Sequence, residues 1–205
     1  MRVIAGEYRR RTLIAPRGMA TRPTSDRLRE TLFNVLAPRL EGARFLDLYA
    51  GSGANGIEAL SRGASRVVFV ERAAAAIAAI RENLAALQVP AGRYAVEGRA
   101  VGAWLRFAMD KMQGIAPGAP LSEAWRGFEV VFLDPPYDLA VEYETTLELL
   151  GGESGALLAP GGVVVAEHRR ARRGGLVGGP GERCGLLKRT RVLEQGDATL
   201  SFYEA

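Results

Sequence analysis

The sequence predicts an α/β fold with a mostly parallel central sheet, and three observations support this prediction. Apolar segments alternate with helical segments from residue 43 to residue 167, and repeated β-α units of this kind require a parallel sheet covered by helices on both faces. The segment FEVVFLD (128–134) is almost continuously apolar, which is typical of a strand buried on both faces. A glycine-rich turn follows the first expected strand and opens a helix, as parallel sheets with ligand-binding turns do.

The N-terminal region precedes this alternation. The first 20 residues mix short apolar pairs with glycine and proline, a pattern that predicts a small hairpin or an extended arm. Residues 24–38 predict an amphipathic helix, because Leu28 and Leu32 recur at helical spacing behind Thr, Ser and Asp cap candidates and Pro38 ends the run.

The remaining elements follow from local periodicity and turn residues. Strands are expected at 43–50, 65–71, 93–98, 128–134 and 161–167. Helices are expected at 55–63, 73–87, 100–112 and 146–150. The C-terminal segments 186–193 and 198–203 predict an antiparallel hairpin around a turn at 194–197, and loops are expected at 114–127 and 169–185.

Composition excludes several classes of protein. With one cysteine, Cys184, and one histidine, His168, the chain of 205 residues has neither an internal disulfide framework nor the ligands of a usual zinc site, so we expect no metal. It contains no apolar run of about 18 residues, and its N-terminus lacks the pattern of a signal peptide. We therefore expect a cytoplasmic protein with no membrane partner.

Positive charge is concentrated in two flanks of the chain. Residues 1–44 carry ten arginines against four acidic residues, net +6, and residues 166–191 carry eight basic against two acidic residues, also net +6. The segment 45–165 carries nine basic against 14 acidic residues, net −5. Such flanks predict phosphate contacts if the fold brings them to one face. Because 25 of the 27 basic residues are arginine, a bias in nucleotide composition is an alternative explanation.

The glycine turn is the first motif with chemical meaning. It contains Gly51, Gly53 and Gly56, with Asp47 four residues before its first glycine and Glu71 at the end of the next expected strand. Glycines allow a tight turn and close approach of a ligand to the backbone, and a carboxylate at the position of Glu71 can accept hydrogen bonds from ribose hydroxyls. The pattern favours an adenosine-bearing cofactor; the alternative is a purely structural turn.

The tetrapeptide Asp134-Pro135-Pro136-Tyr137 follows the expected buried strand. Two prolines restrict the backbone, so the Asp134 carboxylate and the Pro135 carbonyl can face a common point and accept both N–H protons of a planar amine. This favours a pyramidal nitrogen whose lone pair can attack a methyl group. The Tyr137 ring offers a stacking surface for a base.

These motifs resemble those of S-adenosylmethionine-dependent methyltransferases with a Rossmann-like fold, whose amine-methylating members carry such a tetrapeptide. The segments TRPTSDRLRETLFNVLAP (21–38), FLDLYAGSGANGIEALSRGA (45–64) and VFLDPPY (131–137) are similar to those of the RsmD family. That family methylates the N2 amine of one guanine in bacterial small-subunit (16S) ribosomal RNA, and the likeness extends nearly from end to end. The resemblance implies an RNA-binding appendage at 1–40 and a methyltransferase domain at 41–205.

The resemblance also implies roles for individual residues. Gly51 and Gly53 would lie against the methionine part of the cofactor, with Asp47 beside them. Glu71 would bind the ribose of the cofactor. The residue pair that meets the adenine in the family is replaced here by Arg99-Ala100, so the backbone amide of Ala100 is the candidate for that contact. The residues Asp134 to Tyr137 would hold the guanine. Phosphate contacts would come from the arm and first helix, namely Arg9, Arg10, Arg11, Arg22, Arg27 and Arg29.

Direct, metal-free methyl transfer by a monomer acting on ribosomal RNA or the 30S subunit is therefore the expected function. No cysteine lies near the tetrapeptide, so covalent catalysis is not expected. An adenine-N6 DNA methyltransferase would use the same tetrapeptide, although the chain shows no separate target-recognition domain. An NAD-dependent oxidoreductase would share the glycine turn, and a non-catalytic factor would bind ribosomal RNA without modifying it.

Overall fold

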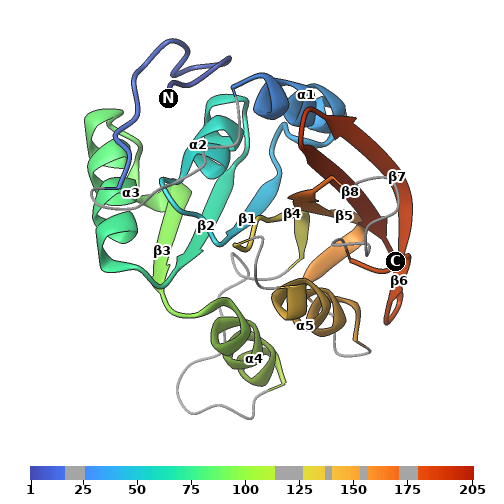
Figure 1. Ribbon diagram of the computed structural model, residues 1–205. Helices are drawn as coiled ribbons and strands as arrows, with labels where there is room; N and C mark the ends of the chain where they lie inside the picture. Colours follow the sequence, from blue (N-terminus) through green and yellow to red (C-terminus); the bar gives the residue numbers. More distant parts are fainter. Residues whose placement is uncertain (17–25, 114–126, 137–139, 153–156, 171–179) are drawn as a thin grey trace. The chain divides into compact units, whose positions relative to one another are not determined.

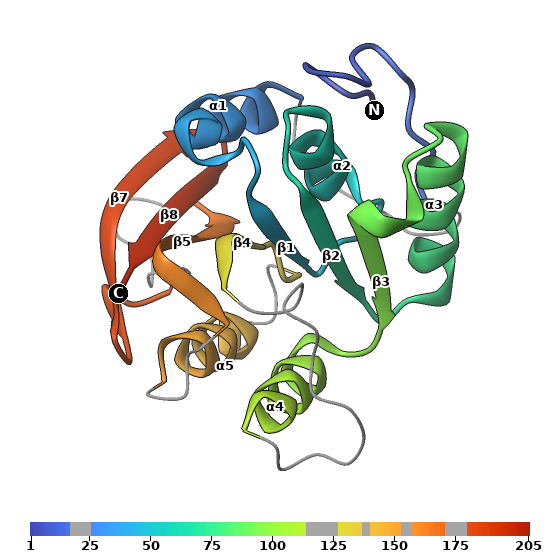
Figure 2. The same ribbon diagram turned by 180° about the vertical axis from the view of Figure 1, so that it is seen from behind.

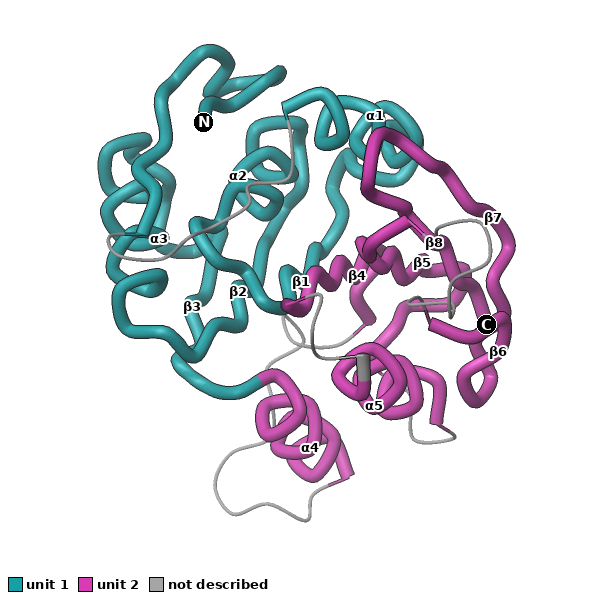
Figure 3. The backbone as a smooth tube through the Cα atoms, in the orientation of Figure 1, with its two compact units in different colours: residues 1–100 teal, residues 101–205 magenta. Residues whose placement is uncertain are grey.

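The computed structural model describes residues 1–16, 26–113, 127–136, 140–152, 157–170 and 180–205. Within these residues the chain divides into two units, Met1–Ala100 and Val101–Ala205, shown in separate colours in Figure 3.

Unit 1 contains a parallel sheet of three strands. The strands β1 (Arg44–Leu48), β2 (Arg66–Glu71) and β3 (Tyr94–Gly98) lie in the order β3-β2-β1. The helix α2 (Ala54–Ser61) packs against β1 and β2, and the helix α3 (Ala74–Ala86) packs against β3 (Figure 1, Figure 2). These elements confirm the β-α alternation that the sequence predicts.

The close packing of α2 on β2 depends on a glycine. A Cβ atom at Gly56 would overlap the ring of Phe69 and contact Val67 at 2.8 Å. The third glycine of the turn therefore serves packing between helix and strand.

The helix predicted over 24–38 changes type at its end, and its first two residues lie outside the described part of the chain. It forms α1 (Asp26–Leu36), followed by the 3₁₀ helix η1 (Ala37–Arg39), and a second 3₁₀ helix, η2 (Ala91–Arg93), precedes β3. Pro38 lies inside η1, where its missing N–H removes a donor that a continuing α-helix would need.

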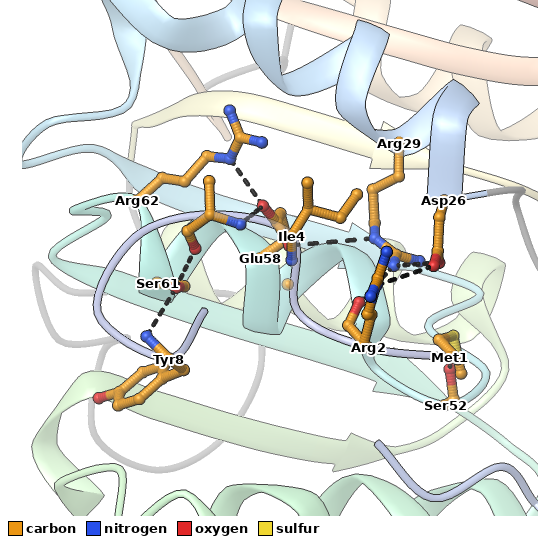
Figure 4. A network of polar contacts seen from close by, with 12 residues as sticks. Met1, Arg2, Ile4, Tyr8, Asp26, Arg29, Ser52, Glu58, Ser61 and Arg62 are labelled. Atoms are coloured by element: carbon orange, nitrogen blue, oxygen red, sulfur yellow. Dashed lines mark hydrogen bonds and ion pairs between the residues drawn. The ribbon is translucent and has the colours of Figure 1, made fainter. Parts of the chain in front are cut away.

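The N-terminal arm, residues 1–16, is held to α2 by side chains rather than by a regular hairpin (Figure 4). The Glu58 carboxylate accepts hydrogen bonds from the amides of Ile4 (2.8 Å) and Ala5 (3.0 Å), and the Ser61 hydroxyl accepts one from the amide of Tyr8 (2.9 Å). Within the arm, the antiparallel bridge between Arg2 and Thr12 is accompanied by backbone hydrogen bonds from the amides of Val3, Arg10 and Leu13 to the carbonyls of Arg11 (2.9 Å), Val3 (2.9 Å) and Met1 (3.0 Å), so the expected hairpin forms, but without regular strands.

Unit 2 contains a mixed sheet. Its strands are β4 (Phe128–Leu133), β5 (Leu158–Arg169), β6 (Arg183–Cys184), β7 (Leu187–Gln195) and β8 (Ala198–Glu204), in the order β4-β5-β8-β7-β6. The pair β4-β5 is parallel, and the other pairs are antiparallel. The predicted parallel core and C-terminal hairpin are thus confirmed.

Two expectations about unit 2 need correction. The helix expected at 146–150 begins earlier, as α5 (Ala140–Gly151), while α4 (Val101–Met112) agrees with its prediction. Cys184 was expected in a loop but lies in β6 with a buried side chain, because β7 extends the sheet to this segment. The expected division of the chain after residue 40 remains a prediction.

The contact between the arm and α2 leads to a test of stability. Gly6 has φ +81°, and a Cβ atom there would overlap the Ser61 carbonyl, whereas Gly42, with φ +72°, has open space around its Cβ position. Both Gly→Ala substitutions incur about 1–2 kcal/mol of left-handed strain. We expect Gly6→Ala to cost about 1–3 kcal/mol more through the steric overlap, measured by urea unfolding.

Hydrogen exchange of the Ile4 and Ala5 amides provides a local readout of the same change. We expect both amides to lose protection in Gly6→Ala and to keep it in Gly42→Ala, the matched control. Equal stabilities of the two variants, with equal protection, would contradict the contact.

Candidate functional site

The carboxyl ends of the three parallel strands of unit 1 place the predicted cofactor residues at one edge of its sheet. In the strand register, Leu48 is opposite Val70 and Glu71 is opposite Gly98. The glycine turn, the Glu71 carboxylate and the segment leading to Ala100 therefore follow adjacent strand ends, which is where ligands bind in open parallel sheets.

The first two glycines of the turn have different reasons to be glycine. Gly51 has φ +54°, and a Cβ atom built there would meet only the Tyr49 carbonyl oxygen, at 4.0 Å. Gly53, with φ +77°, would place its Cβ atom 3.0 Å from Ile80 and 3.3 Å from Phe69. Gly51 thus leaves room for a ligand to approach the backbone, while Gly53 is required by packing under the turn.

The Glu71 carboxylate holds the turn in place. Its Oε2 accepts a hydrogen bond from the Gly51 amide (2.9 Å), and its Oε1 accepts one from each amide of Arg72 and Ala73 (2.8 Å). Because a carboxylate has about four acceptor positions, roughly one remains for a ligand hydroxyl. The residue therefore fits the expected ribose contact.

Asp47 lies beneath the turn, with 1% of its surface exposed. Its Oδ2 accepts a hydrogen bond from the Gly56 amide at 2.8 Å. Burial raises the pKa of Asp47 to about 8; the hydrogen bond from Gly56 opposes this shift and the charge of Glu71 adds to it. Asp47 therefore fixes the start of α2, and its burial gives it no surface to offer a cofactor.

Two further groups of unit 1, the N-terminus of α2 and Ala100, lie at this edge. Gly53 caps α2 without a side-chain hydrogen bond, and helix N-termini attract anionic groups such as a carboxylate. Ala100 is exposed just beyond β3, in a position that fits the expected backbone contact. The donors and acceptors of this edge fit a nucleoside with an amino-acid tail.

In unit 2, Asp134, Pro135 and Pro136 follow β4 directly, and Tyr137 lies outside the described residues. Asp134 is partly exposed, while Pro135 is buried. The Tyr143 hydroxyl lies 2.9 Å from the Glu167 carbonyl oxygen and 3.3 Å from the Pro135 carbonyl oxygen. Tyr143, on α5, thus connects the prolines to β5.

The single histidine and cysteine show no sign of a catalytic role. Both ring nitrogens of His168 are engaged, by the Ser201 hydroxyl (2.9 Å) and the Arg169 carbonyl (3.0 Å). Burial lowers the pKa of His168 and raises the pKa of the Cys184 thiol. Both shifts favour the neutral side chains, which suits structural residues.

The arginines of the arm and first helix differ in exposure. Arg9, Arg10 and Arg27 are exposed, and Arg11, also exposed, donates a hydrogen bond to the Ala86 carbonyl (2.9 Å). Arg22 lies outside the described residues. The exposed side chains are open to contact by an anionic partner.

Arg29 is a clear departure from the expected set. Its side chain is fully buried, and Nη2 donates to the Arg2 carbonyl (2.6 Å) and to Asp26 (2.8 Å), while Nε lies 4.0 Å from Glu58 (Figure 4). A guanidinium in this position joins α1 to the arm and to α2. Its burial contradicts the expected phosphate contact.

Among the described residues, no group of three His, Cys, Asp or Glu side chains could hold a metal ion. No helix in that part of the chain is long and apolar enough to cross a membrane.

Sequence reasoning missed three residues that organise the site, namely Glu58, Asn83 and Tyr143. Glu58 and Asn83 are polar residues on buried faces of predicted helices, a signal that could have marked both as partners of another segment. Tyr143 falls outside the helix expected at 146–150, so its position on α5 could not be anticipated.

Comparisons with known proteins cover nearly the whole chain. A family model described as "Conserved hypothetical protein 95" matches residues 1–204. The chain is 36% identical over 170 residues to "Putative rRNA methyltransferase YlbH" of Bacillus subtilis, covering 83% of each protein. It is 39% identical over 150 residues to "Ribosomal RNA small subunit methyltransferase D" of Escherichia coli K12, covering 73% of this chain and 66% of that protein.

A solved structure, "Putative methyltransferase yhhF from Escherichia coli", matches with a TM-score of 0.72 and 32% identity, over 99% of this chain and 96% of that one. This match confirms the predicted fold class over both units.

The raised pKa of Asp47 leads to a prediction about pH. The unfolded chain releases this proton near its ordinary pKa of about 4, whereas the folded protein retains it up to about pH 8. The contribution of Asp47 to stability is therefore fully present below about pH 4 and is lost as the pH rises to about 8, by at most about 1.4 kcal/mol per pH unit.

Asp47→Asn should remove this dependence, because the amide keeps an acceptor for Gly56 and cannot ionise. The unfolding free energy of each protein is measured by urea titration. The difference between variant and wild type should shift in favour of the variant as the pH rises from 5 to 8. A difference that does not change with pH would show that Asp47 is ionised throughout this range.

Proposed function

The chain belongs to the conserved hypothetical protein 95 family, and from this premise we propose that it is an S-adenosylmethionine-dependent methyltransferase of ribosomal RNA. The observation that carries the proposal is the turn held by Glu71: its Gly51 backbone is open to a ligand, and its anchoring carboxylate has an acceptor position left. The similarity to two proteins named as rRNA methyltransferases supports the choice of RNA as the substrate.

The residues of unit 1 would bind the cofactor, which supplies a methyl group already activated on a sulfonium ion. The Gly51 backbone and the N-terminus of α2 would hold the amino-acid part, Glu71 one ribose hydroxyl and the Ala100 amide the adenine. Asp47 contributes by holding the Gly56 amide, and so the shape of the turn.

The finer proposal is that the acceptor is the N2 amine of one guanine in the small-subunit (16S) RNA. The Asp134 carboxylate and the Pro135 carbonyl would accept the two N–H protons of this amine, with Pro136 fixing the backbone and Tyr137 stacking on the base. The Tyr143 hydroxyl lies 3.3 Å from the Pro135 carbonyl oxygen and would help to hold it in place. A base in folded RNA must first leave its stack, which requires a few kcal/mol.

The exposed arginines of the arm and α1 would supply binding energy for that step. Arg9, Arg10, Arg11 and Arg27 are accessible to RNA phosphates, and Arg22 completes the proposed set. Arg29 is excluded from it because of its burial. An RNA substrate of this kind would place the protein in the cytoplasm.

Replacing Asp134 by Ala tests the role of the tetrapeptide. With labelled S-adenosylmethionine and unmodified small ribosomal subunits, we expect methyl transfer to fall by about 100-fold or more, since one of two fixed acceptors is lost. Affinity for S-adenosylhomocysteine should stay within about twofold, because the proposed cofactor residues all belong to unit 1. The control is Glu144→Ala, which removes an exposed carboxylate on α5.

Mass analysis of the product nucleoside separates the possible outcomes. N2-methylguanosine at a single position supports the finer proposal. N6-methyladenosine would show that the target is an adenine rather than a guanine. Binding of the RNA without any product would indicate a non-catalytic assembly factor. Full activity of Asp134→Ala would refute the role given to this residue.

The double substitution Arg9→Ala, Arg10→Ala tests the RNA contacts of the arm. Each phosphate contact contributes about 0.7–0.9 to the slope of log affinity against log salt concentration, so we expect the slope to decrease by up to about 2. Arg106→Ala, an exposed arginine on α4, is the control for general charge loss. If both variants changed the slope equally, the arm would have no special role in RNA binding.

A further inference from the structure

Asn83 joins the end of the N-terminal arm to the glycine turn. This residue of α3 is 2% exposed. Its Oδ1 accepts a hydrogen bond from the Ile14 amide (2.8 Å), and its Nδ2 donates to the Ile14 carbonyl (3.1 Å) and to the Ser52 carbonyl (3.2 Å). One buried amide group thus binds the backbone of two segments 38 residues apart, since Ile14 and Ser52 differ by that number.

The beginning of the arm reaches the same point of the turn. The Met1 carbonyl accepts a hydrogen bond from the Leu13 amide (3.0 Å), and the Ser52 hydroxyl lies 3.6 Å from the Met1 sulfur (Figure 4). Both ends of the arm therefore meet at Ser52. The arm is a neighbour of the turn as well as of α2.

Ser52 stands between Gly51 and Gly53, both with positive φ. Glycines lose more conformational freedom on ordering than other residues do, so this part of the turn depends on external ties to keep one shape. Glu71 holds the turn at the Gly51 amide, and Asn83 holds it at the next residue.

We propose that Asn83 is a positioning residue that couples the arm to the cofactor turn, so that RNA bound at the arm strengthens cofactor binding. The inference rests on the proposed function for the identity of the two ligands. RNA bound at the arm would further restrict the movement of Ile14, and Ile14 keeps the Asn83 amide aimed at Ser52. By linkage, the cofactor strengthens RNA binding by the same factor.

Asn83→Ala tests the coupling by calorimetry with S-adenosylhomocysteine, with and without unmodified small-subunit RNA. In the wild type we expect RNA to tighten binding by about fivefold or more, the lower end of typical coupling. The variant should bind S-adenosylhomocysteine more weakly. The ratio of its dissociation constants for S-adenosylhomocysteine without and with RNA should fall to about 1. Its KM for S-adenosylmethionine should rise while kcat at saturating substrates is retained.

Two further variants separate coupling from a loss of stability. Val89→Ala removes a buried side chain beyond the end of α3. It should lower stability without changing the ratio of the dissociation constants for S-adenosylhomocysteine measured without and with RNA. Ile14→Pro removes the amide that Asn83 binds, at a residue with 41% of its surface exposed, and should reproduce the effect of Asn83→Ala even if that variant folds poorly.

The outcomes distinguish this inference from the proposed function. If the wild type binds S-adenosylhomocysteine and methylates RNA, but Asn83→Ala and Ile14→Pro keep the wild-type ratio, the coupling is refuted and the function stands. A change of the same size in Val89→Ala would likewise overturn the inference, since it would trace the effect to stability. If the wild type binds no S-adenosylhomocysteine, both proposals fail.

Discussion

The shape of the glycine turn in unit 1 depends on two acidic side chains, Asp47 and Glu71, whose oxygens accept hydrogen bonds from its backbone amides. Asp47 holds the Gly56 amide from beneath, and Glu71 holds the Gly51 amide from the end of the next strand. Without such acceptors, a turn with positive φ at two glycines would have many conformations. The start of α2 follows from this turn, and α2 in turn carries the residues that bind the arm.

The arm illustrates how buried polar groups specify a contact that apolar packing alone would leave open. Glu58 is fully buried and binds the Ile4 and Ala5 amides together with the Arg62 guanidinium. A buried carboxylate without partners would be strongly destabilising. The position of the arm is therefore set by where these donors can reach Glu58, and Arg29 is drawn into the same network from α1.

The two candidate sites were predictable to different degrees. The glycine turn and the tetrapeptide are runs of neighbouring residues, so their residue types and their places after strands could be predicted from local patterns. The hydrogen bonds that the individual atoms of these motifs form could not be predicted in this way. Three acceptor positions of Glu71 are taken by backbone amides, and the Pro135 carbonyl lies beside a tyrosine of α5.

By itself, the sequence determined the alternation of strands and helices, the glycine turn and the tetrapeptide, because each depends on residues close together in the chain. Only the tertiary structure decided which polar side chains are buried and what they bind. Arg29 carries the same charge as Arg27, yet it is buried while Arg27 is exposed. The pairs that Glu58 and Asn83 form span 54 and 69 positions, and burial at such a distance depends on the assembled fold rather than on neighbouring residues.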